Sequence, residues 1–377
     1  MKFELSPFLQ ALVAILIVVG GPFLLFGPGP VQSPVQNPDT SPNTVELNLN
    51  SKIYVAIEGE GKISVIDPVG QKVVKNIDLS GFMPHNVQVS PDNKTVWVTG
   101  NAAAHSHSIR LIQSVNAEGD NPDEVIVIDP SSDKVIKRIP IRPGIHLAHV
   151  VLTPDSRYAY VTAQTEGVIN KIDAVSFRLI KSIKTGEESQ PHGLRISLDE
   201  KYAYVAMLGS RALGILDLSN DSFSEIFLGG AAVQAGVTPD NKYAVVSLYD
   251  TKRLAIYDVI GKKINYVELP VSAKGPIQMY STPDSRFIYL ADQGYYFEQP
   301  SSEWVYKIDM MAKKVVKEIK AGKAPHGVVV SGDGKFVYVT NLLSEDVSVI
   351  DTSSDQEVGR IKVGKEPNGI SVWNKNN

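Results

Sequence analysis

From residue 51 onward, hydrophobic and polar residues alternate in short segments, a pattern that predicts β-strands rather than helices. In the segments 95–98, 158–161, 202–205 and 336–339, aromatic and β-branched residues are concentrated at alternating positions. This composition and this period of two suit a sheet whose two faces differ. Most of the chain is therefore expected to be all-β.

A strand-like segment that ends in aspartate recurs along this part of the chain. The seven aspartates are Asp67, Asp129, Asp173, Asp217, Asp258, Asp309 and Asp351. Spacings between successive aspartates range from 41 to 62 residues, and four of the six lie between 41 and 44. Repeats of this length, built from short strands, are typical of the four-stranded blades of β-propellers.

A turn motif fixes the phase of the repeat. Serine or threonine followed by Pro-Asp and a small polar residue occurs at 90–93, 153–156, 238–241 and 282–285, with variants at 197–200 and 331–334. Proline favours the first corner of a type I turn, and aspartate accepts hydrogen bonds from nearby backbone amides. Each copy therefore predicts a hairpin that joins two strands of one blade.

The order of the strands predicts how the ring closes. The first repeat begins with three strands, at 53–56, 63–66 and 73–77, and six complete repeats follow. One further strand at 368–373 has the sequence of an inner strand and no successor. Its pairing with the first strand would remove two exposed sheet edges. We expect a seven-bladed β-propeller over residues 51–373, followed by a tail at 374–377.

The end of the chain resembles a known family of repeats. The sequence YVTN at 338–341 follows Pro-His-Gly at 325–327 and precedes Val-Ser-Val-Ile-Asp at 347–351. This combination resembles the YVTN family of β-propeller repeats, which is related to the haem d1 domain of nitrite reductases and to archaeal surface-layer propellers. The resemblance covers roughly residues 51–373. It implies the fold and leaves the function open, because propellers host many unrelated activities.

The first fifty residues differ in composition from the repeats. Residues 8–26 are uncharged and mostly apolar, which is long enough for a transmembrane helix. We favour a single-pass anchor over a cleaved signal peptide, because no small-x-small cleavage site follows. Lys2 precedes the run and the next basic residue is Lys52, so residues 1–7 are predicted to be cytoplasmic and the propeller periplasmic or extracellular. The five prolines of 27–50 predict an extended tether.

Composition narrows the possible chemistry. The 377 residues include no cysteine, which excludes disulfides, thiolate metal sites, iron–sulfur clusters and cysteine nucleophiles. The formal net charge of −4 gives no indication of nucleic-acid binding. Walker A, Gly-x-Ser-x-Gly and His-Glu-x-x-His motifs do not occur. Whether the protein is an enzyme stays open, and a lactonase-like or lyase-like propeller has no motif in its support.

Four histidines occupy related places in the repeat. His85, His192 and His326 lie at the start of predicted inner strands, and His149 lies one position later in its own repeat. Because strand direction alternates, these positions fall on one face of the ring, at the mouth of the central channel. The imidazoles could simply tie their loops to the backbone. They could instead hold copper or haem, since imidazole is a common ligand of both copper and iron.

Two insertions lengthen the repeat on the same face. The first, at 101–122, carries His105 and His107, two further candidate metal ligands. The second, at 292–303, carries Tyr295, Tyr296 and Phe297, which suggest a lid or a contact with a partner protein. A loop that packs its own aromatic rings is the alternative.

These features favour a membrane-anchored, extracytoplasmic propeller that acts as a protein-interaction or scaffold module in an envelope or membrane complex. The alternative is a redox or metal-handling protein with copper or haem held by His85, His149, His192 and His326. Nitrous oxide reductase is similar in holding a copper cluster with histidines at one mouth of a propeller channel.

Overall fold

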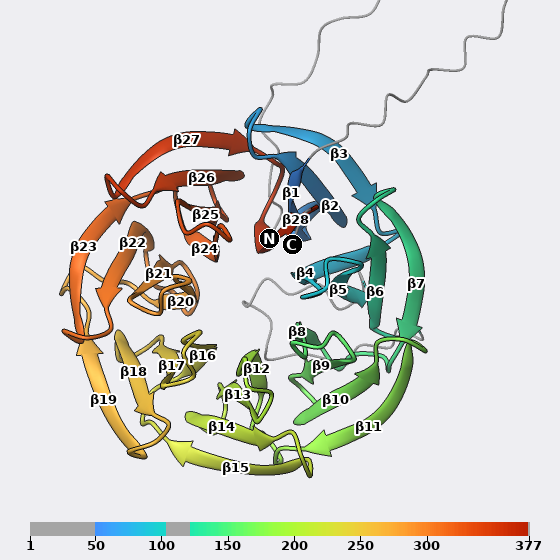
Figure 1. Cartoon of the computed structure of the whole chain (residues 1–377), viewed down its shortest axis with the longest axis horizontal. Helices are drawn as coiled ribbons and strands as arrows, with labels where there is room; N and C mark the ends of the chain where they lie inside the picture. Colours follow the sequence, from blue (N-terminus) through green and yellow to red (C-terminus); the bar gives the residue numbers. More distant parts are fainter. Residues whose placement is uncertain (1–49, 103–120, 376–377) are drawn as a thin grey trace, which may run out of the picture. The chain divides into compact units, whose positions relative to one another are not determined.

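The computed structural model describes residues 50–102 and 121–375. These residues form seven antiparallel four-stranded sheets arranged as blades around a central channel (Figure 1). The expected all-β fold and the count of seven blades are therefore confirmed. The predicted N-terminal segment 1–7, the anchor 8–26 and nearly all of the tether 27–50 lie outside the described residues. In the part of the chain that the structure describes, no helix has the length and apolar character that a membrane span requires.

Each blade contributes one inner strand to the wall of the channel. The inner strands, from the first blade to the seventh, are β28 (Pro367–Asn374), β4 (Phe82–Val89), β8 (Leu147–Leu152), β12 (Pro191–Ile196), β16 (Ala232–Val237), β20 (Pro276–Ser281) and β24 (Pro325–Val330). The second strands are β1 (Ser51–Ile57), β5 (Val96–Ala102), β9 (Tyr158–Ala163), β13 (Tyr202–Met207), β17 (Tyr243–Leu248), β21 (Phe287–Gly294) and β25 (Phe336–Asn341).

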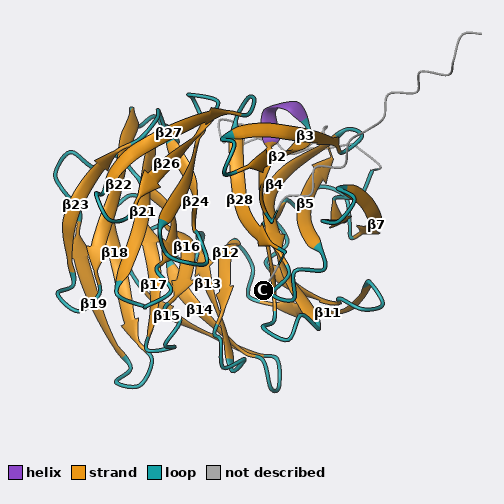
Figure 2. Cartoon of the chain, turned by 45° about the horizontal axis from the view of Figure 1, so that its top comes forward, coloured by secondary structure: helices purple, strands orange, loops and turns teal. Residues whose placement is uncertain are grey.

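The third and fourth strands complete each blade toward its outer edge. The third strands end in the repeated aspartates and are β2 (Lys62–Asp67), β6 (Glu124–Asp129), β10 (Val168–Asp173), β14 (Ala212–Asp217), β18 (Arg253–Asp258), β22 (Ser301–Asp309) and β26 (Asp346–Asp351). The outer strands are β3 (Lys72–Asp78), β7 (Lys134–Pro140), β11 (Arg178–Lys184), β15 (Ser222–Phe227), β19 (Lys263–Glu268), β23 (Lys314–Lys320) and β27 (Gln356–Lys362). The loops lie at the two ends of the blades, with the single helical turn η1 (Glu58–Glu60) at one of them (Figure 2).

The first and last strands of the propeller close the ring. Strand β28 pairs antiparallel with β1, with Ile53 opposite Val372 and Val55 opposite Ile370. The first blade thus combines one strand from the C-terminal end of the chain with three from the N-terminal part, as expected. This pairing covers the inner edge of β1 and makes β28 the innermost strand of its blade, as in the other six blades.

The repeated turn motif forms hairpins as predicted. In the first copy, the hydroxyl of Ser90 donates to the Asp92 carboxylate at 2.7 Å. The next residue, Asn93, adopts a left-handed conformation with φ of 57°. Ser156 and Asn241 occupy the same position in later copies, both with φ of 58°. The motif is therefore a turn with one residue at positive φ, which small polar residues tolerate better than large ones.

The core lies between neighbouring blades. One cluster joins Tyr54 and Val65 of the first blade to Val87 and Val98 of the second, and all four side chains are almost fully buried. Comparable clusters fill the other interfaces between blades. Outer strands such as β3 expose most of their residues, so the apolar pattern fades toward the rim.

The closing strand should contribute strongly to stability. Trp373 of β28 is 8% exposed and packs into the core between the first two blades, and its indole nitrogen donates to the Asn93 carbonyl at 2.8 Å. Replacing Trp373 by alanine should lower the free energy of unfolding by about 3–5 kcal/mol, measured by urea denaturation.

A conservative change on an outer strand provides the control. Val358 on β27 is 52% exposed, so Val358→Ala should change the free energy of unfolding by no more than about 0.5 kcal/mol. Equal, small effects of the two substitutions would show that β28 does not close the ring in solution.

Candidate metal centre

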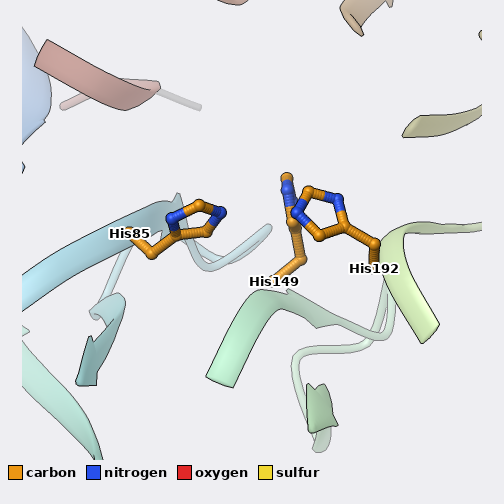
Figure 3. Close-up of side chains that lie close together, drawn as sticks. All are labelled: His85, His149 and His192. Carbon is orange, nitrogen blue, oxygen red and sulfur yellow. The ribbon is translucent and has the colours of Figure 1, made fainter. Parts of the chain in front are cut away.

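Three histidines from neighbouring blades converge at the channel. His85 lies on β4, His149 on β8 and His192 on β12, and their rings point toward one another (Figure 3). Each offers one ring nitrogen, and these three atoms lie within 4.8 Å of one another. The structure therefore brings together three of the histidines that the repeat pattern placed on one face.

Threonines of the second strands hold these inner strands in register. The Thr162 hydroxyl accepts a hydrogen bond from the His149 amide at 3.0 Å and donates one to the His192 carbonyl at 2.7 Å. Thr99 links β4 to β8 in the same way. Each hydroxyl joins two adjacent blades, so these threonines fix the spacing between the backbone positions that carry the histidines.

The three rings are packed edge to face. The ring centroids of His149 and His192 are 5.1 Å apart, those of His85 and His192 5.6 Å, and those of His85 and His149 6.0 Å. His149 is fully buried and His85 is 7% exposed. The cluster thus sits inside the protein rather than on a solvated loop.

Several ring nitrogens of the cluster have no hydrogen-bond partner among the described residues. These atoms are both nitrogens of His149 and Nε2 of His85. A buried polar atom without a partner costs roughly 1–3 kcal/mol. His192 differs, because its Nδ1 donates to the Val233 carbonyl at 2.8 Å. That bond places the lone pair of His192 on Nε2, where it is available to a ligand.

A carboxylate and an amide lie beside the other nitrogen of His85. Nδ1 of His85 is 3.5 Å from the Glu58 carboxylate and 3.2 Å from Nδ2 of Asn368. Asn368 also donates to Glu58 at 2.6 Å. Glu58 belongs to η1 and Asn368 to β28, so both ends of the propeller meet at this ring. A carboxylate that orients a histidine through Nδ1 is a common feature of metal sites.

Burial keeps His149 and His192 of the cluster, and the nearby His326, uncharged. Desolvation, with smaller contributions from the neighbouring histidines, lowers the pKa of His149 well below its ordinary value. Burial also lowers the pKa of His192 to about 3. The pKa of His326 is lowered well below its ordinary value for the same reason. These imidazoles are therefore neutral at pH 7, the form that binds metal ions.

A small cavity opens beside the cluster. Its volume is about 120 Å³. Its walls include His85 and His192 but not His149. The other residues that line it are Glu58, His146, Gln164, Thr165, Gln190, Leu208, Val233, Tyr249, Ile277, Gln278, Tyr296, Phe297 and His326.

The other residues that the sequence predicted for the site do not belong to the group of three histidines. His326 lines the same cavity but does not belong to the group of three. His105 and His107 lie outside the described residues, as does most of the insertion that carries them. Tyr296 faces the cavity, with its ring centroid 6.3 Å from that of His326. Tyr295 is exposed at the surface, and Phe297 is exposed while also lining the cavity.

Sequence reasoning did not assign roles to three residues of this site. His146 packs its ring against His85, with centroids 5.2 Å apart. Glu58, in the helical turn after the first strand, and Asn368, on the last strand, lie beside Nδ1 of His85. Asn368 occupies, in the last inner strand, the position that histidines occupy in other repeats, so the sequence alone could have identified it. Glu58 lies in a turn that has no counterpart in the other repeats, so the repeat pattern gave no indication of its role.

The chain matches a known family over nearly its whole length. The profile of a family described as "YNCE-like beta-propeller" matches residues 10–377. Hydrazine synthase subunit beta of Kuenenia stuttgartiensis is 25% identical over 290 residues, which cover 76% of this chain and 58% of that protein. The chain therefore spans less than two thirds of the length of this curated relative.

Solved structures share the fold. A functionally unknown protein from Desulfotomaculum acetoxidans superimposes with a TM-score of 0.67 at 14% identity, covering 86% of this chain and 99% of that one. Dihydro-heme d1 dehydrogenase NirN in complex with DHE gives a TM-score of 0.57 at 16% identity, covering 83% of this chain and 64% of that one. At these identities the likeness concerns the fold alone.

The neutral histidines should make the metal-free protein sensitive to mild acid. His149, His192 and His326 stay unprotonated when folded but gain protons below about pH 6.5 when unfolded. The unfolded state then binds more protons, so the free energy of unfolding falls as pH falls. Between pH 6 and pH 5, each histidine should contribute up to about 1.4 kcal/mol per pH unit.

Urea denaturation of metal-free protein at several pH values measures this slope. The variant His149→Gln should lose one titrating group and show a slope shallower by up to about 1.4 kcal/mol per pH unit. Identical slopes for the variant and the unaltered protein would contradict burial of a neutral His149.

Proposed function

The chain belongs to the YNCE-like β-propeller family, and we propose that it is a metal-binding member in which His85, His149 and His192 hold one transition-metal ion. One observation carries the proposal: three imidazoles have ligand atoms within 4.8 Å of one another, and several of their buried nitrogens have no partner among residues 50–102 and 121–375. A bound ion would use these lone pairs and remove the free-energy cost of burying them.

Copper is the ion that the donor set fits best. The site offers neutral imidazole nitrogens, and the chain contains no cysteine. Imidazole suits copper, zinc, iron and nickel, and among divalent first-row ions copper binds most tightly to a given set of nitrogen ligands. We therefore name copper(II) as the preferred ion, with zinc(II) as the main competitor.

Haem, the other cofactor considered from the sequence, fits the site less well. The cavity beside the histidines has a volume of about 120 Å³. Sites for organic ligands usually have roughly 300–1,000 Å³. The space bounded by the described residues thus suits an ion with a small ligand rather than a macrocycle.

A role in a larger assembly is a second proposal. The relative from Kuenenia stuttgartiensis is named as a subunit of an enzyme, and Tyr295 and Phe297 are 37% and 52% exposed beside the site. These rings would provide apolar contact area for a partner protein. With the proposed anchor at 8–26, such a complex would form outside the cytoplasm, at a membrane or envelope.

Metal analysis tests the metal-binding function directly. Full-length protein incubated with copper(II) and then desalted should retain one copper per chain, with an electron paramagnetic resonance spectrum that shows nitrogen ligands. His149→Gln and His192→Gln should each abolish stoichiometric binding, because two imidazoles hold the ion far less tightly than three.

His326→Gln is the matched control, because His326 is buried in the same cavity but lies outside the group of three. It should keep one copper per chain. Circular dichroism establishes that each variant is folded. Folded, unaltered protein that retains no copper, zinc, nickel or iron would overturn the proposal.

Glu58 should act as a positioning residue for His85. Nδ1 of His85 lies 3.5 Å from the Glu58 carboxylate, so a proton on this nitrogen would face Glu58 and would leave the lone pair on Nε2 for the metal. Glu58→Gln should therefore weaken copper binding about 10–100-fold in a competition titration with a chelator.

Glu60→Gln is the control in the same helical turn. The Glu60 carboxylate accepts hydrogen bonds from Lys62 and from the Lys365 amide and does not line the cavity. Its replacement should leave copper affinity unchanged. Equal affinities of the two variants would exclude Glu58 from any role in the site.

A further inference from the structure

We propose that the open side of the three-histidine site binds a small inorganic anion, which reaches it through a cationic groove on the same face of the propeller. This inference rests on the proposed metal site and deepens it by naming a class of ligand. It follows from three features: a histidine cluster that faces a cavity on one side, the small volume of that cavity, and a neighbouring groove with excess positive charge.

The cluster has one closed side and one open side. His149 is fully buried and does not line the cavity, whereas His85 and His192 do. An ion held by the three rings is thus covered by protein at His149 and faces the cavity on the other side. Sites with three protein ligands and an open position are typical of metals that bind an exogenous ligand.

The cavity limits the size of that ligand. It has a volume of about 120 Å³. Part of its wall is apolar, formed by Leu208, Val233 and Ile277. Organic ligands usually occupy larger sites. A metal-bound species of two or three non-hydrogen atoms fits this space, and the metal ion is the group that fixes its orientation.

Positive charge gathers just outside the cavity. A groove of about 420 Å³ is lined by Arg211, Lys252 and Lys274, with Asp250 as its one acidic wall residue. Arg211 is paired with Asp250 at 2.7 Å, so the two lysines leave the groove with a net positive charge. This local field contrasts with the overall charge of −4 and favours the approach of anions.

Aromatic side chains separate the groove from the cavity. Tyr249 and Phe297 line both spaces, with ring centroids 5.3 Å apart. The Tyr249 hydroxyl donates to the Tyr296 carbonyl at 2.7 Å, which anchors the loop that carries Phe297. Tyr249 and Phe297 therefore form the boundary that the groove and the cavity share, and Phe297, which is 52% exposed, is the more exposed of the two.

Glu58 is the one carboxylate among the described residues that line the cavity. It accepts a hydrogen bond from Asn368 and lies on the His85 side of the cavity, 3.5 Å from Nδ1 of that ring. An anion bound to the metal approaches from the side of Tyr249 and Phe297, which carry no charge.

Azide titration of the copper-loaded, full-length protein tests this inference. Azide should bind with millimolar or tighter affinity, seen as a new azide-to-copper absorption band and a changed paramagnetic resonance spectrum. The double variant Lys252→Gln and Lys274→Gln should keep one copper per chain but weaken azide binding about three- to tenfold at low salt. Added salt should reduce this difference.

The control removes the same number of charges elsewhere. Lys263 begins β19 and Lys314 begins β23, so both lie at the end of the blades away from the site. The double variant Lys263→Gln and Lys314→Gln should therefore leave azide affinity unchanged.

If copper is bound but azide changes neither spectrum, the anion assignment is wrong and the metal site stands. If both double variants bind azide like the unaltered protein, the groove has no role. If the folded protein retains none of copper, zinc, nickel or iron before azide is added, both proposals are overturned.

Discussion

The hydrogen bonds between β1 and β28 are the constraint on which the rest of the molecule depends. They join the two ends of the chain into one blade and so convert a row of sheets into a ring. In a closed ring the inner strands surround a common axis, and equivalent positions in neighbouring repeats must face the same space. Closure also places Asn368 of β28 and Glu58 beside His85. The geometry of the site is therefore a consequence of the way the ring is completed.

Within that ring, the histidine cluster contains buried ring nitrogens that have no hydrogen-bond partner among the described residues. Threonine hydroxyls bridge adjacent blades and hold the backbone of His149 and His192 in place. The rings of His149 and His192 are neutral, and both nitrogens of the buried His149 have no partner among the described residues. A rigid backbone around nitrogens that have no hydrogen-bond partner is preorganised for binding, because few side chains must become ordered when a ligand binds. The metal and anion proposals both follow from this arrangement.

Much of the fold could be predicted from the sequence, because it repeats. The aspartate at the end of each third strand indicated the number of blades, and the Pro-Asp turns showed where the first two strands of a blade are joined. Alternating strand direction also placed His85 and His192 on one face. The approach of the ring nitrogens to within 4.8 Å of one another could not be predicted. His85, His149 and His192 lie on three consecutive blades, whereas His326 lies on the seventh blade and outside the group of three. Such details depend on side-chain rotamers and on contacts between blades, as the inward position of Tyr296 also does.

X-ray absorption spectroscopy at the copper edge tests the central claim most directly, because it reports the ligands of the ion itself. For the copper-loaded protein we expect three imidazole nitrogens at about 2.0 Å, plus one exchangeable light atom at the open position. A copper environment with fewer than three imidazoles, or one left unchanged when His149 is replaced, would contradict a centre built by three adjacent blades.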